Sequence, residues 1–253
     1  MDNYYLKLKK FVGTILLVSL VAMVISILQK DRLPGKEEIL DELYNEPLQT
    51  ELSMAPFTIG KRGVNYLIKP LYNYELYGMV VTYHHSYVWW DTEHKDDFIN
   101  TKDICVIWGD NISSEVYKKM KFSSGSWTCY YDFPSGLSCA EAAKFKGTCL
   151  SNNHVLLADD RLNRLIMNAE RGDQIYIKGY LVSYTQEKWG SFERRSSLSR
   201  KDNLCEVIYV ADFKILKKAN YFWRLLYKIS KYMFILCIIL LALMHYKDPR
   251  YSV

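Results

Sequence analysis

Residues 172–184, GDQIYIKGYLVSY, decide how the middle of this chain folds. After a Gly-Asp turn, β-branched and aromatic residues recur in a strand-like pattern, which predicts one long strand over residues 174–184. Gly179 lies inside that strand, and a glycine at such a position often marks a bulge or a barrel bend. The stretch therefore predicts a strongly curved sheet.

The segments on either side complete a β-rich pattern. Asp159 or Asp160 is expected to cap a helix, RLNRLIMNAE, that lies between two strands, and a second short helix is predicted over residues 138–145. The predicted strands are residues 64–68, 75–84, 104–109, 127–133, 154–158, 174–184 and 204–213, with a break at Pro70 after the first. A helix before a long kinked strand and a closing strand is typical of small barrels of the OB type.

We therefore expect an α+β domain over residues 57–216: a β-rich small barrel or strongly curved, OB-like sheet with one or two short helices. The pair GDQIYIKGYLVSY and CEVIYVADFKIL is similar to the last strands of single-stranded-DNA-binding OB domains. That similarity concerns the fold and brings no function with it.

Two apolar segments flank the predicted domain and predict two transmembrane helices. Residues 11–28 are uncharged and long enough to cross a bilayer, which needs roughly 17–25 residues. No small-x-small cleavage site follows them, so a signal anchor is favoured over a cleaved signal. Residues 221–246 predict an interfacial helix that continues into a second span, with a buried helix of the domain as the alternative. The remaining parts are a basic tail (residues 1–10), an acidic helix and linker (29–56) and a C-terminal tail (247–253).

The positive charge lies near these two segments. The whole chain has a net charge of +5, but residues 29–220 carry 25 Lys and Arg against 26 Asp and Glu. This balance disfavours a nucleic-acid partner, which would favour positive charge on the domain. Membrane lipid and a protein partner or a second copy of the chain are the expected partners, and no cofactor or small-molecule substrate is identified. The basic N-terminal tail favours a periplasmic domain, and basic residues near the second segment favour a cytoplasmic one. Because the first span usually dominates orientation, we expect the domain on the periplasmic side of a bacterial inner membrane.

Several stretches resemble a family of uncharacterised bacterial membrane-anchored proteins. They are PLYNYELYGMVVTYHH, DICVIWGDN, SNNHVLLADD, GDQIYIKGYL, RSSLSRKDN and CEVIYVADF, at positions 70–85, 103–111, 151–160, 172–181, 195–203 and 205–213. The resemblance covers about residues 57–213 and implies a bacterial inner-membrane protein. It implies no activity.

The cysteines of the domain are disulfide candidates. They are Cys105, Cys129, Cys139, Cys149 and Cys205. No CxxC motif and no zinc-finger spacing occurs, which disfavours a structural zinc site. An oxidising compartment would pair some of them, for example Cys139 with Cys149, but the sequence leaves the connectivity open. In the cytoplasm all five would be reduced thiols.

Three groups of residues are candidate sites, each with a structural alternative. The first is a metal-binding loop made of His84, His85, Asp91 and His94, which is otherwise a polar loop after a strand. The second is a catalytic His154 with Asp159 or Asp160. Ser151 beside that histidine is a poor nucleophile because neighbouring strand residues face opposite ways, and the alternative is a hydrogen-bonded loop.

The third group is a basic loop that could contact an anion, a lipid head group or an acidic partner. It contains Arg194, Arg195, Ser197, Arg200 and Lys201, and the alternative is a solvated hairpin tip. No P-loop, GxGxxG or HExxH motif occurs. The sequence therefore favours a non-enzymatic binding or assembly domain without catalytic residues or a metal. A membrane-surface hydrolase and an anionic-lipid module remain alternatives.

Overall fold

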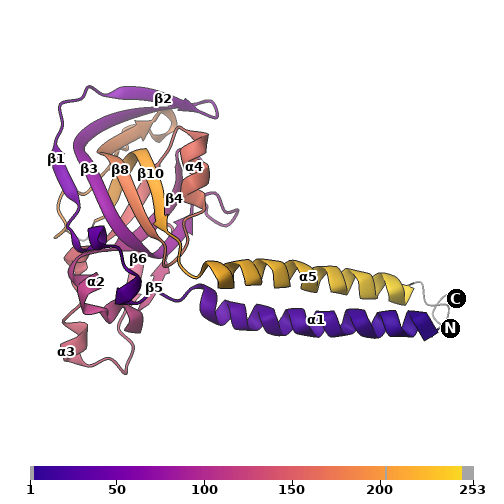
Figure 1. Cartoon of the computed structure of the whole chain (residues 1–253). Coiled ribbons are helices and arrows are strands. Elements are labelled where there is room, and N and C mark those ends of the chain that lie inside the picture. Colours follow the sequence, from indigo (N-terminus) through magenta and orange to yellow (C-terminus); the bar gives the residue numbers. More distant parts are fainter. Residues whose placement is uncertain (1–2, 203, 247–253) are drawn as a thin grey trace. The chain divides into compact units, whose positions relative to one another are not determined.

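The computed structural model describes residues 3–202 and 204–246, which form two units. One unit contains the two terminal helices, and the other comprises residues 33–218. The second unit combines a large sheet with short helices (Figure 1), which confirms the predicted α+β class.

The helical unit is an antiparallel pair formed by α1 (Asn3–Lys30) and α5 (Tyr221–Tyr246). Asn220 donates side-chain hydrogen bonds to the carbonyls of Lys30 and Arg32, so residues beside the start of α5 satisfy carbonyls at the end of α1. Among the described residues, these two helices are long and apolar enough to cross a membrane. The second helix begins at Tyr221, as predicted, and α1 extends beyond the predicted residues 11–28.

The main sheet has the strand order β1-β3-β4-β7-β10-β8-β9, and β2 pairs with β3. The strands are β1 (Leu48–Glu51), β2 (Phe57–Lys61), β3 (Val64–His85), β4 (Asn100–Ile107), β7 (Leu150–Leu156), β8 (Gln174–Gln186), β9 (Arg194–Arg195) and β10 (Glu206–Lys217). Strand β8 also pairs with β3, so the pairings run from β3 through β4, β7, β10 and β8 back to β3. Only β7 and β10 are parallel among the described pairs.

Gly179 allows β8 and β10 to approach each other closely. A Cβ at this position would lie 2.1 Å from the Tyr209 carbonyl oxygen of β10, which no side chain tolerates. The pairing shifts register between Val210 and Asp212, just beyond the glycine. The extra residue, Ala211, lies on β10, and β8 pairs with β3 without a shift at Gly179, so the irregularity lies on the partner strand and not on β8 as predicted.

The helix α4 (Asp160–Met167) lies between β7 and β8 in the chain, as predicted. Asp159 is its N-cap and accepts hydrogen bonds from the amides of Arg161 and Leu162. At the other end the buried Lys102 donates to the carbonyls of three residues, Ile166, Met167 and Ala169. Burial lowers the pKa of Lys102 to about 7.

The remaining elements are short. They are the helices α2 (Asp110–Ser114) and α3 (Cys139–Ala142), the 3-10 turns η3 (Val116–Lys119), η4 (Gly147–Cys149) and η5 (Glu187–Trp189), and the hairpin strands β5 (Lys121–Ser124) and β6 (Cys129–Asp132). The second predicted helix is thus reduced to α3.

Two local predictions were wrong. The acidic helix is replaced by the 3-10 turns η1 (Lys36–Glu38) and η2 (Asp41–Tyr44), because the Gln174 amide accepts from the Leu40 amide and donates to the Glu38 carbonyl between them. Pro70 does not end a strand. Strand β3 continues through it, and the pairing with β8 shifts register just after the proline.

Candidate functional site

A row of ionisable side chains crosses three neighbouring strands. His84 of β3 is the register partner of Asp103 on β4, and Asp103 is the register partner of His154 on β7. Directly opposed residues of antiparallel strands project to the same face, so these side chains are neighbours. Asp103 and His154 are each only 1% exposed.

The loop between β3 and β4 adds Asp91 and His94 to this row. One oxygen of Asp91, Oδ2, lies 2.6 Å from His84 Nε2 and 2.8 Å from His94 Nδ1, and the other accepts the amides of Glu93 and His94. Burial raises the pKa of Asp91, but the hydrogen bonds from His84 and His94 outweigh it and leave the pKa below its usual value. Asp91 therefore holds both imidazoles in place as a carboxylate.

His94, Asp103 and His154 form a second, deeper group. Their potential ligand atoms all lie within 4.8 Å of one another. His154 Nδ1 is 2.7 Å from Asp103 Oδ1, yet the two atoms lack hydrogen-bond geometry. Within residues 3–202 and 204–246, neither these atoms nor His94 Nε2 has a hydrogen-bond partner. Two imidazoles and a carboxylate are ligands that suit a transition metal.

Trp127 and Arg194 cover this group. The Trp127 ring centroid lies 4.2 Å from that of His94 and 6.3 Å from that of His154. The Arg194 guanidinium lies 4.0 Å from the Trp127 ring centre and donates to His154 Nε2 at 2.8 Å. A disulfide between Cys105 of β4 and Cys129 of β6 ties the strand of Asp103 to the segment that carries Trp127.

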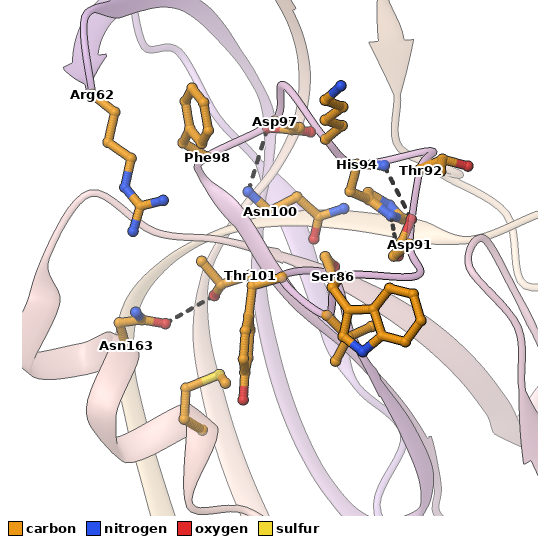
Figure 2. A pocket seen from close by; sticks show the side chains of 15 residues that line it. Arg62, Ser86, Asp91, Thr92, His94, Asp97, Phe98, Asn100, Thr101 and Asn163 are labelled. Atoms are coloured by element: carbon orange, nitrogen blue, oxygen red, sulfur yellow. Dashed lines mark hydrogen bonds and ion pairs between the residues drawn. The ribbon is translucent and has the colours of Figure 1, made fainter.

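A pocket of about 490 Å³ borders the same loop, with lining residues from 86–101, Arg62 and α4. Figure 2 shows the Asn100 side chain in the middle of this lining, between Asp97 and Ser86. Asn100 is 1% exposed, and neither atom of its amide group, nor the Ser86 hydroxyl, has a hydrogen-bond partner among the described residues. Buried polar groups are rarely left in this state.

The predicted metal-binding loop is divided by the structure. His84, Asp91 and His94 come together. His85, by contrast, is the register partner of Lys102, one position along from the pair of His84 with Asp103. Neighbouring strand residues face opposite sides, so His85 is directed away from Asp91. Burial and the nearby Lys102 lower the pKa of His85 to about 4.

The predicted catalytic partners of His154 have other contacts. Asp159 caps α4, and the Asp160 carboxylate lies 2.6 Å from Lys61 Nζ. The carboxylate beside His154 is Asp103, which the sequence placed at a strand boundary. Ser151 lies on the same strand as His154, and its hydroxyl accepts a hydrogen bond from Asn153.

The predicted basic loop does not form one exposed patch. Arg194 lies against Trp127 and His154, Arg200 contacts Glu46 and the Pro47 carbonyl, and the buried Ser197 donates to Asp202. Arg195 and Lys201 are exposed. The loop thus contributes one side chain, Arg194, to the covered group.

The cysteines separate into one bonded pair and free thiols. Cys105 and Cys129 are joined, while Cys139, Cys149, Cys205 and Cys237 are free. The pair Cys139 and Cys149, taken above as an example, is not formed: Cys139 is exposed and Cys149 is buried.

Sequence reasoning missed Asp103, Asn100 and Trp127. Residues 100–103 were left outside the predicted strand because they are polar, although β4 begins at Asn100. Asn100, Thr101, Lys102 and Asp103 show no alternation of apolar and polar residues, so the sequence carries no local strand signal for them. No family model, curated protein or solved structure matches the chain.

Proposed function

We propose that this chain is a membrane-anchored, non-enzymatic binding protein for a small neutral saccharide, held in the pocket beside the β3–β4 loop. The observation that carries the proposal is the buried Asn100 amide, whose donor and acceptor are both unpartnered among the described residues. Leaving a buried donor or acceptor without a hydrogen bond costs about 1–3 kcal/mol for each group. Neighbouring hydroxyls of a sugar supply an acceptor and a donor at the spacing of one amide.

The charges around the pocket favour a neutral ligand. Arg62 and Lys95 are balanced by Asp91 and Asp97 in the lining. Both carboxylates have internal partners: Asp91 is bound to the two imidazoles, and Asp97 accepts a hydrogen bond of 2.5 Å from the Tyr184 hydroxyl. No carboxylate of this lining is left to hold a cationic ligand.

Aromatic side chains at the pocket favour a ligand with an apolar face. Trp89 and Tyr87 line it and are 88% and 66% exposed. Phe98 also lines it, is half-buried, and has the Arg62 guanidinium over its ring. A pyranose presents C–H groups on one face and hydroxyls at its edge, which suits flat aromatic rings beside a buried amide. The pocket volume is in the range of small-molecule sites, about 300–1,000 Å³.

The strand pairings support an OB-type barrel for this domain. The order β3-β4-β7-β10-β8 returning to β3, with α4 between β7 and β8, is the arrangement of a five-stranded Greek-key barrel. In such barrels, ligands bind at the second and third strands and the loops beside them. The β3–β4 loop and Asn100 of β4 occupy that region here.

The disulfide supports a periplasmic location in a bacterial inner membrane. Disulfides persist in oxidising compartments and are rare in the cytoplasm. Cys105 and Cys129 are bonded within the sheet unit, and the two terminal helices suit a double membrane anchor with both chain ends on the cytoplasmic side. A reporter fusion after residue 215 tests this: active alkaline phosphatase supports the location, and a fluorescent fusion with inactive phosphatase contradicts it.

Ligand-observed NMR on the detergent-solubilised full chain tests the binding function. Neutral disaccharides should show saturation transfer, and their charged counterparts, an aminosugar and a uronic acid, should not. Asn100→Ala should weaken binding by about tenfold or more, as expected for two lost hydrogen bonds. Asn65→Ala, at an exposed asparagine of β3, is the matched control. Equal binding by the Asn100 variant, or no transfer to any neutral sugar, would contradict the proposal.

A further inference from the structure

We propose that His94, Asp103 and His154 form a binding site for one divalent transition-metal ion. The three residues come from a loop and two strands, and each is at least 97% buried. His94 and Asp91 also line the pocket, but Asp103 and His154 do not, so variants of Asp103 test the metal site separately from the saccharide.

The hydrogen bonds distinguish this group from its neighbour. In the group of His84, Asp91 and His94, the carboxylate binds both imidazoles and both of its oxygens are used. In the group of His94, Asp103 and His154, the facing atoms have no hydrogen-bond partner in the described parts of the chain. The carboxylate of the first group is fully hydrogen-bonded without an ion, whereas the second group has only the 2.7 Å contact between His154 and Asp103, without hydrogen-bond geometry.

The donor set and its surroundings suit zinc or a related ion. Two histidines and one carboxylate occur in zinc sites that keep an open fourth position. Tetrahedral ligands at about 2.1 Å from one ion lie roughly 3.4 Å apart. An ion would therefore widen the 2.7 Å contact between His154 and Asp103 and shorten the longest separation, which is at most 4.8 Å. These are adjustments of side chains, not of strands.

Asp91 provides the outer contact that metal-bound histidines usually have. Its carboxylate holds His94 Nδ1 at 2.8 Å, which leaves Nε2 directed to the group and fixes the ring tautomer. The backbone amides of Glu93 and His94 fix Asp91 in turn. Asp91 is therefore a positioning residue for this site and not a ligand.

Arg194 competes with the ion for His154. It donates to His154 Nε2, whereas a neutral imidazole that binds a metal through Nδ1 carries its proton on Nε2. Metal binding therefore requires Arg194 to withdraw from this hydrogen bond while it stays stacked on Trp127. Arg194→Gln removes a positive charge and the competing hydrogen bond, and should bind the ion more tightly than the unsubstituted protein.

Zinc binding to the full chain in detergent tests the site. After chelation and dialysis, calorimetric titration and elemental analysis should give one Zn²⁺ per chain, and Co²⁺ should give the visible absorption of a low-coordinate site. Asp103→Asn should weaken Zn²⁺ binding by more than about 100-fold, and Asp91→Asn by about 10- to 100-fold. His85→Gln, on the neighbouring position of β3 that faces away, should bind as the unsubstituted protein does.

Two controls separate a metal site from a merely structural cluster. Zn²⁺ should raise the unfolding temperature of the unsubstituted protein and of His85→Gln, but not that of Asp103→Asn, whose circular dichroism should be unchanged. Absence of Zn²⁺ and Co²⁺ binding at micromolar concentration, or equal affinity of Asp103→Asn, would overturn the proposal and leave a metal-free histidine–aspartate pair.

Discussion

Replacing Glu206 with glutamine should stabilise the domain at neutral pH. Glu206 is the first residue of β10, is 6% exposed, and its Oε2 atom has no hydrogen-bond partner in the described residues. Burial raises the pKa of Glu206 from 4.5 to about 8. Glutamine has nearly the same shape and cannot ionise, so the substitution removes the charge without opening a cavity.

The expected magnitude follows from the two pKa values. Because the pKa is higher in the folded chain, the folded state binds more protons between pH 4.5 and pH 8, and stability falls as the pH rises through this range. The pKa of Glu206 in the unfolded chain is about 2.5 units below pH 7, so keeping the carboxyl protonated in the folded chain at this pH costs about 3 kcal/mol. The gain from Glu206→Gln is therefore about 3 kcal/mol at pH 7 and below about 1 kcal/mol at pH 5.

Thermal unfolding of the detergent-solubilised full chain, followed by circular dichroism at several pH values with a chelator present, checks this. A gain of about 3 kcal/mol corresponds to an increase in Tm of roughly 6–12 °C for a unit of this size. Glu51→Gln, at an exposed glutamate of β1, is the matched control. The reasoning is refuted if Glu206→Gln loses stability between pH 5 and pH 8 as steeply as the unsubstituted protein does.

Three further substitutions have defined outcomes. The pKa of the buried Lys102 is lowered from 10.5 to about 7, so the folded state binds fewer protons than the unfolded state between these values and stability rises with pH. Lys102→Met should abolish this rise, as measured by urea unfolding curves from pH 7 to pH 10. Gly179→Ala places a Cβ 2.1 Å from a backbone carbonyl of β10 and should prevent accumulation of folded protein, whereas Gly60→Ala, with its nearest neighbour at 3.6 Å, should fold. Replacing Cys105 and Cys129 together with serine opens a loop of sequence separation 24 and should cost about 3 kcal/mol, seen as a lower Tm that reducing agent no longer changes.

Local patterns were sufficient to predict much of the fold. The cap at Asp159 and the helix start at Tyr221 each depend on a few neighbouring residues. The α+β class followed from the order of such elements. By contrast, a continuous β3 through Pro70 depends on pairing with β8, more than one hundred positions away in sequence, so local signals mispredicted it.

The candidate site was predicted only in part, for the same reason. His84, Asp91 and His94 are close in sequence, at the end of β3 and in the loop that follows it, and these residues do meet. The approach of Asp103 and His154 depends on the register between β4 and β7, which no short pattern encodes. A one-residue slip would place Asp103 on the other face of the sheet.

The pairing of β3 with β8 also affects how the chain can fold during its synthesis. Tyr66 pairs with Gln186, so the partner of an early part of β3 is made more than one hundred residues later. At a synthesis rate of about 5–20 residues per second, the 22-residue strand remains unpaired on its β8 side for several seconds to tens of seconds. Lys69 and Pro70 lie within this temporarily unpaired part of β3. The charge of Lys69 and the missing N–H of Pro70 are features that discourage an open strand edge from pairing with other chains. Pro70, which does not end β3, therefore protects the open edge of this strand from intermolecular pairing before β8 is made.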